Sequence, residues 1–145
     1  MGGNLGTGAG QMGMRSDWRA RLGDYLATEA RRPFEYGKSD CALFAAGALK
    51  AMTGFDPSAA YRGRYTSLRG GLRILRKDGF HDHVERAAAL LAEVPPQRAR
   101  VGDIAVVDTG DGPSLGMVQG EWIAVRTMTG LGFVPVDQAV RVFRP

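Results

Sequence analysis

The chain has 145 residues, with 44% hydrophobic and 23% charged side chains and a formal net charge of +4. These values are typical of one compact globular domain that buries a core of its own. The single cysteine excludes an internal disulfide, and no apolar run reaches the ~18 residues that a membrane span requires. The arginines are scattered rather than interleaved with aromatic residues, so the charge does not indicate a nucleic-acid partner.

The N-terminal segment differs in composition from the rest of the chain. Six of the first 14 residues are glycine and none is charged. Because glycine loses the most freedom on ordering, this segment would pay a large entropic cost and bury little. We expect residues 1–15 to be a flexible arm, or an arm held by a partner or by its own domain, and residues 16–145 to be the folded domain. The segment lacks the basic-then-apolar order of a signal peptide.

Two helices are predicted in the first third of the folded domain. The first begins at Ser16, a favourable N-cap, and ends near Glu29, before the proline at position 33. The second begins at residue 39 or 40 and ends at Gly54, and its interior is almost uniformly small and apolar. A helix that is apolar nearly all round is a buried one. Cys41 is therefore expected in the first turn of a central, buried helix.

The second half of the chain changes from helical to strand-forming patterns. Two more helices are predicted over residues 66–78 and 83–93, before Pro95 and Pro96. Five short strands are then predicted between Gly, Asp and Pro turns: 104–107, 115–118, 122–125, 133–136 and 140–143. Helices first and an antiparallel sheet afterwards predict an α+β domain, in which the N-terminal helices pack on a C-terminal five-stranded sheet.

The helix that begins at Cys41 suggests a chemical role for the thiol. Partial positive charge at a helix N-terminus stabilises a thiolate, which lowers the thiol pKa and raises nucleophilicity at neutral pH. The competing interpretation is that a lone cysteine simply packs in the core, as most free cysteines do. The helix position alone leaves both interpretations open.

Residues around Cys41 and in the second half form an ordered set of motifs. The three main elements are Asp40–Cys41, the Gly-Asp-strand at 102–107 and the strand at 115–120. This set resembles the NlpC/P60 superfamily of papain-like cysteine peptidases. More closely, it is similar to a small branch of that superfamily found in tailed phages and gene-transfer-agent-like elements. The segments that carry this closer similarity are Trp18–Leu22, Pro33–Cys41, Thr53–Pro57 and Gly130–Val136.

The resemblance implies a papain-like NlpC/P60 fold over nearly the whole domain, with the central helix starting at Cys41. It also implies a place among tail genes, and so a protein of the tail tip or hub. Active superfamily members cleave the stem peptides of peptidoglycan, a reaction that helps a particle to cross the cell wall. Cys41 occupies the position of their nucleophile.

A catalytic thiol of this kind needs a general base and a third polar group that orients the base. The superfamily places the base at the start of the strand at 115–120, where this chain has Ser114, or Leu115 if the register shifts by one. A serine hydroxyl cannot accept a proton near neutral pH. Residues 122–127 offer no His, Asn or Asp as the third group. The resemblance therefore implies that the nucleophile position is kept while the expected base is missing.

Two residues near Cys41 are weaker site candidates. Asp40 either tunes the thiol or simply caps the helix, and its negative charge near the sulfur would oppose thiolate formation. Tyr36 points either into a substrate cleft or into the core.

The chain has two histidines, His81 and His83, and both lie in a polar segment of the helical half. The plainest interpretation is a solvated surface pair. Two alternatives are a base that has moved to this segment and a metal site with Asp82 or Asp78, although a third ligand is not evident. We expect neither a metal nor a cofactor.

These observations favour a phage tail-tip or hub protein with a degenerate NlpC/P60 domain and a structural or adaptor role. Its partners would be tail proteins, contacted in part through residues 1–15, and its place the virion after synthesis in the bacterial cytoplasm. The alternative is an active cysteine peptidase or amidase that cleaves peptidoglycan with Cys41 as nucleophile and an unconventional base.

Overall fold

The computed structural model describes residues 13–145, so the predicted arm lies mostly outside the described residues. Its last two residues belong to the domain. Met14 packs against the core, and the backbone N–H of Arg15 donates to the carbonyl of Met52 at 2.8 Å. The start of the described chain is thus fastened to the end of the central helix.

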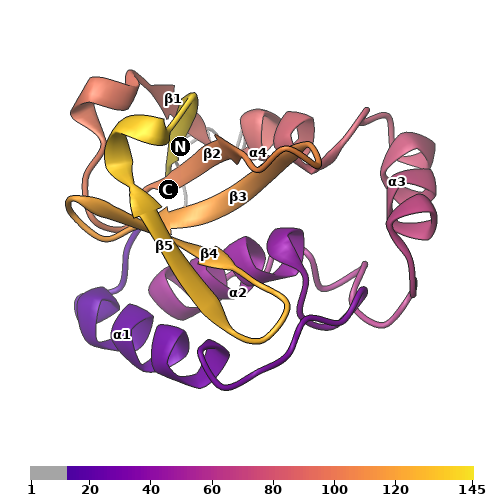
Figure 1. The fold of residues 1–145 in the computed structure, drawn as a ribbon, viewed down its shortest axis with the longest axis horizontal. Helices are drawn as coiled ribbons and strands as arrows, with labels where there is room; N and C mark the ends of the chain where they lie inside the picture. The colour runs from indigo at the N-terminus through magenta and orange to yellow at the C-terminus, as the bar shows by residue number, and fades with distance from the viewer. Residues whose placement is uncertain (1–12) are drawn as a thin grey trace, which may run out of the picture.

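The protein has two layers, with helices packed against one face of a sheet (Figure 1). The helices are α1 (Trp18–Glu29), α2 (Cys41–Thr53), α3 (Leu68–Lys77) and α4 (His83–Leu90). The strands are β1 (Ala92–Val94), β2 (Ile104–Asp108), β3 (Pro113–Val118), β4 (Trp122–Arg126), β5 (Leu131–Pro135) and β6 (Arg141–Arg144). All pairings are antiparallel, in the order β1-β6-β2-β3-β4-β5. The predicted α+β class is confirmed.

Helix α2 is the centre of the domain and packs on α1, β3 and β4. The Asp40 side chain caps it by accepting from the N–H of Leu43 at 2.9 Å, and Gly54 ends it with a φ of 87°. A Cβ at Gly47 would lie 2.2 Å from the hydroxyl of Tyr25, so glycine is required where α1 crosses α2. The uniform apolarity of this helix reflects its burial on several sides, as its sequence predicts.

The predicted number of strands, five, is wrong, because the sheet has six. The additional strand is β1, which pairs with β6 and places Glu93 opposite Phe143. The helix predicted over 83–93 ends early, and Leu91 already has the extended angles φ −126° and ψ 155°. Three residues of Ala-Glu-Val carry no clear period, so only the pairing with the distant C-terminal strand identifies them as a strand.

The sheet is covered on both faces, which explains why its inner strands are continuously apolar. One face packs on α1, α2 and α4. The other face packs with residues of the short 3-10 segments Pro96–Arg98 and Val136–Gln138 and their neighbours. Residues Ile104, Ala105, Val106 and Val107 of β2 are therefore all buried in succession.

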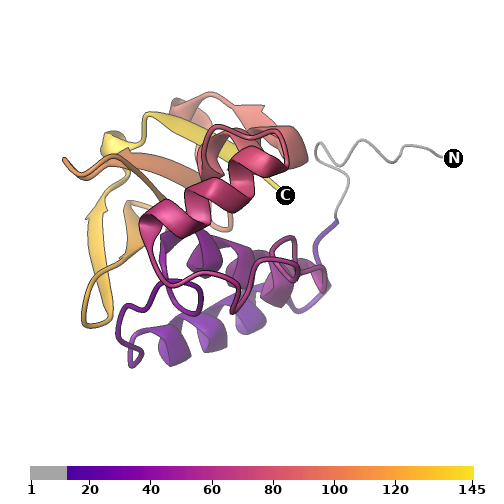
Figure 2. The ribbon, with the colours of Figure 1, turned by 90° about the vertical axis from the view of Figure 1, so that its right-hand side faces the viewer.

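Helix α3 is the least embedded element. Figures 1 and 2 show it standing at one side of the domain, in front of the other helices in the second view. Every residue of Leu68–Lys77 is at least partly exposed, and α3 packs mainly on α4. Within residues 13–145, no helix is long and apolar enough to cross a membrane.

Candidate active site

Two helix N-termini converge at one end of the domain. Cys41 is the first residue of α2 and His83 is the first residue of α4. The Cys41 Sγ lies 3.8 Å from the His83 Nε2. This is hydrogen-bond distance for sulfur, so the two side chains form a thiol–imidazole pair although 42 residues separate them in the chain.

The local sequence around His83 fixes the ring at the start of α4. The Asp82 side chain accepts from the N–H of Glu85 at 2.9 Å, which caps the helix. The Glu85 carboxylate in turn accepts from the N–H of His81 at 3.1 Å. The first turn is therefore held on both sides of His83, whereas the side chain of His81 is exposed. Only one of the two histidines belongs to the site.

Charge and hydrogen bonding favour the ionised form of both members of the pair. Burial opposes the thiolate, but the hydrogen bond and charge of His83, with help from Ser114, lower the pKa of Cys41. Burial likewise opposes the imidazolium, but Cys41 and the nearby Asp82 charge raise the pKa of His83. The position at a helix N-terminus acts in the same direction on the thiol. Each member of the pair therefore favours the charged form of the other.

The start of β3 supplies the remaining polar groups. The backbone carbonyl of Pro113 stabilises the protonated ring of His83. Since Nε2 faces the sulfur, the other ring nitrogen is free to donate to such an acceptor. Ser114 is buried, and its hydroxyl stabilises the Cys41 thiolate. Ser114 therefore lies in the site as a hydrogen-bond donor, while His83 occupies the place of a base.

Asp40 is buried, and its carboxylate binds backbone N–H groups rather than the thiol. Its carboxylate accepts from the N–H groups of Leu43 at 2.9 Å and Gly37 at 3.0 Å, and from the hydroxyl of Tyr65 at 2.5 Å. Its charge raises the pKa of Cys41, so it opposes the activation of the thiol. The three donors stabilise the carboxylate, and the helix-cap interpretation of Asp40 agrees with the structure.

Cys41 and His83 lie in a cleft of about 470 Å³. Tyr36 lines this cleft and packs edge-on against Phe34, with ring centroids 4.7 Å apart. Besides these, the walls come from α3, the β2–β3 turn and the β4–β5 turn: Leu68, Leu72, Leu75, Thr109, Asp111, Gly112, Thr127 and Met128. Cys41, Ser114, Asp40 and Tyr36, the four site residues singled out from the sequence, thus all border one cavity.

A buried ion pair supports the wall of the cleft that carries the segment leading to Cys41. Arg126 of β4 donates to the Glu29 carboxylate at 2.8 Å and to the carbonyls of Arg32 and Gly130. Both side chains are almost fully buried. The end of α1 is thereby fastened to the β4–β5 turn, and the loop between α1 and α2 is held over the sheet.

The sequence interpretation undervalued His83. A signal existed, because an aspartate followed three residues later by a glutamate marks a helix start, and His83 lies inside that turn. The local sequence does not show that the start of α4 lies beside the start of α2. Among residues 13–145, no group of three or more His, Cys, Asp and Glu side chains could hold a metal ion.

Comparison with known proteins places the chain in a family without an assigned role. No curated protein matches it. A family model described as a domain of unknown function, DUF6950, matches residues 14–145. The match covers the described domain from Met14 to the last residue of the chain. The chain therefore belongs to the DUF6950 family.

Proposed function

We propose that this protein is a cysteine hydrolase that cleaves amide bonds through an acyl-enzyme on Cys41, with His83 as the general acid and base. The observation that carries the proposal is the 3.8 Å distance between Sγ and Nε2 in a cleft open to substrate. The absence of a base at Ser114 favoured a structural role. His83, which lies at the start of α4, is close enough to Cys41 to act as the missing base.

In the first step, the Cys41 thiolate attacks the carbonyl carbon of the substrate and forms a carbon–sulfur bond. The carbonyl electron pair moves onto oxygen. When the tetrahedral intermediate collapses, the carbon–nitrogen bond breaks and the His83 imidazolium gives its proton to the leaving amine. The products of this step are a thioester on Cys41, a free amine and a neutral imidazole.

In the second step, neutral His83 takes a proton from water, and the hydroxide attacks the thioester carbon. The carbon–sulfur bond breaks, the carboxylic acid leaves, and the thiolate and imidazolium are restored. The Pro113 carbonyl stabilises His83 whenever it carries the proton. Ser114 stabilises the thiolate at the start and at the end of the cycle.

The start of α2 offers stabilisation for the developing oxyanion. The first N–H groups of a helix have no acceptor within the helix. The N–H of Leu43 is used by Asp40, which leaves those of Cys41 and Ala42 at the mouth of the cleft. Backbone donors of this kind stabilise a tetrahedral oxyanion.

For the substrate, we propose a peptide of the bacterial cell wall. The support is the resemblance of the motif order to the NlpC/P60 superfamily, together with a central helix that begins at the cysteine and packs on an antiparallel sheet. We propose the same papain-like arrangement here, with the base moved from the start of β3 to the start of α4. Action at a phage tail tip is part of this proposal.

The test uses purified sacculi and two histidine variants. Wild-type protein should release stem-peptide fragments, and Cys41→Ser should abolish the release. His83→Gln should lower the rate by ~10²-fold or more, because general acid–base catalysis contributes about that much. His81→Gln changes an exposed histidine two residues away and should stay within twofold. Equal activity of His83→Gln and wild type would overturn the role of His83.

A further inference from the structure

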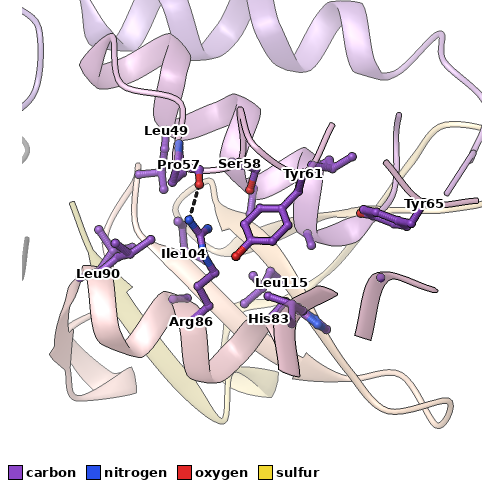
Figure 3. Close-up of a pocket in the computed structure, with 18 residues that line it drawn as sticks. Leu49, Pro57, Ser58, Tyr61, Tyr65, His83, Arg86, Leu90, Ile104 and Leu115 are labelled. Atoms are coloured by element: carbon purple, nitrogen blue, oxygen red, sulfur yellow. Dashed lines mark hydrogen bonds between the residues drawn. The ribbon is translucent and has the colours of Figure 1, made fainter. Parts of the chain in front are cut away.

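A second cavity lies directly behind His83, between α2, α4 and the chain around residues 57–65 (Figure 3). Its volume is about 70 Å³. The walls are mainly aliphatic and include Ala46, Leu49, Ala87, Leu91, Ile104 and Leu115. The proposed role of the neighbouring cleft leaves this cavity unexplained.

The cavity adjoins the catalytic cleft. Ala42, Tyr65, Gly71, Leu75 and His83 line both spaces. Ala42 follows the nucleophile directly, and His83 is the proposed base. The two spaces therefore adjoin beside Cys41, on the side of the imidazole that faces α3.

Two polar side chains on the cavity wall, Arg86 and Tyr61, are engaged with protein groups. The Arg86 guanidinium donates to the carbonyl of Pro57, as the dashed line in Figure 3 shows, and lies over the Tyr61 ring at 4.7 Å. The Tyr61 hydroxyl donates to Asp78 at 2.5 Å. Because these two groups are engaged and most of the wall is aliphatic, a charged ligand would lose its hydration and find few partners. The wall instead favours an aliphatic ligand.

We infer that this cavity is the acyl-side specificity pocket, which takes a small branched aliphatic group of the substrate; the inference rests on the proposed hydrolase function. The acyl part stays bound to Cys41 through both steps, so the smaller pocket suits it. The leaving group must depart before water attacks, so the wider cleft suits that group. The volume lies between the ~30 Å³ share of one water and the ~150 Å³ cavity that binds benzene, so an aromatic ring does not fit.

The experiment varies the acyl group at a constant leaving group. Para-nitrophenyl acetate, isovalerate and benzoate each acylate the thiol, and the burst of nitrophenolate reports the acylation rate. Each rate is divided by that of N-acetylcysteine with the same ester, which removes the intrinsic reactivity. The normalised rate should be at least about tenfold higher for isovalerate than for acetate, as burial of several methyl and methylene groups implies, and lowest for benzoate.

Filling the cavity should remove the preference. Ala87→Leu places a larger side chain on the wall, and the isovalerate-to-acetate ratio should fall by about tenfold. Ala89→Leu, on the exposed side of the same helix, should keep the wild-type ratio. Should Ala87→Leu fail to fold, Ala46→Val fills the same space from α2.

Two results would contradict these proposals, and each result contradicts a different one. A Cys41-dependent burst whose acyl preference is absent, or is unchanged by filling the cavity, overturns the specificity pocket alone. Folded wild-type protein that no ester acylates on Cys41 overturns the hydrolase function and the pocket with it.

Discussion

Asp40 and Cys41 are neighbours in the chain, but a negative charge on one disfavours a negative charge on the other. The protein meets this conflict by surrounding the Asp40 carboxylate with donors, among them the Tyr65 hydroxyl. Burial and the contact with Asp40 together raise the pKa of Tyr65, so this hydroxyl keeps its proton. At the scale of single residues, Tyr65 is therefore a positioning residue that shields the thiol from its neighbour.

Removal of this hydroxyl tests the shielding. Tyr65→Phe leaves the Asp40 charge less compensated, which should raise the pKa of Cys41 and lower the thiolate population. We expect alkylation by iodoacetamide at neutral pH to slow by about two- to tenfold, the effect of up to one pKa unit. Tyr36→Phe, which removes a hydroxyl from the same cleft, is the control. Equal rates for the two variants would show that Tyr65 does not shield the thiol.

At the scale of elements, the site depends on how α4 begins. The Asp82 side chain caps α4, and the Ser67 side chain caps α3 in the same way by accepting from the N–H of Gly70 at 3.0 Å. The two caps are comparable in geometry, but only the first lies next to His83. A comparison of the two caps can therefore distinguish an effect on helix stability from an effect on the position of His83.

Alanine variants at the two caps test this distinction. Asp82→Ala and Ser67→Ala should each lower the free energy of unfolding by about 1 kcal/mol, measured by urea denaturation. Only Asp82→Ala should also slow the acylation of Cys41, because the first turn of α4 carries His83. Loss of acylation in both variants to the same extent would indicate a general effect of stability.

The junction between α1 and the β4–β5 turn is the second test at this scale. Arg126→Met leaves the Glu29 carboxylate buried without its main partner, so unfolding should become easier by about 3–5 kcal/mol. Arg141→Met breaks an ion pair of similar length, 2.7 Å against 2.8 Å, whose side chains are 42% and 47% exposed. Exposed pairs contribute less than about 1 kcal/mol. Similar losses in both variants would contradict the structural role of Arg126.

At the scale of the whole molecule, the sequence predicts what local patterns encode. Apolar periods locate α1 and α2 closely. The predicted cap Ser16 is wrong, because α1 begins after Asp17 and has no side-chain cap hydrogen bond, whereas the Asp40 cap places Cys41 at a helix start. The short strand β1 escapes prediction because its pairing with β6 is made about 50 residues away. The Cys41–His83 pair escapes for the same reason: tertiary packing brings together two helix starts that are far apart in sequence.

The central claim is that His83 activates Cys41, and the pH dependence of thiol alkylation tests it most directly. Because His83 lowers the pKa of Cys41, the wild-type thiolate should form below the ~8.5 midpoint of a free thiol. The account predicts that His83→Gln moves the midpoint of the rate profile upward and that His81→Gln leaves it in place. Coincident profiles for wild type and His83→Gln would contradict the account.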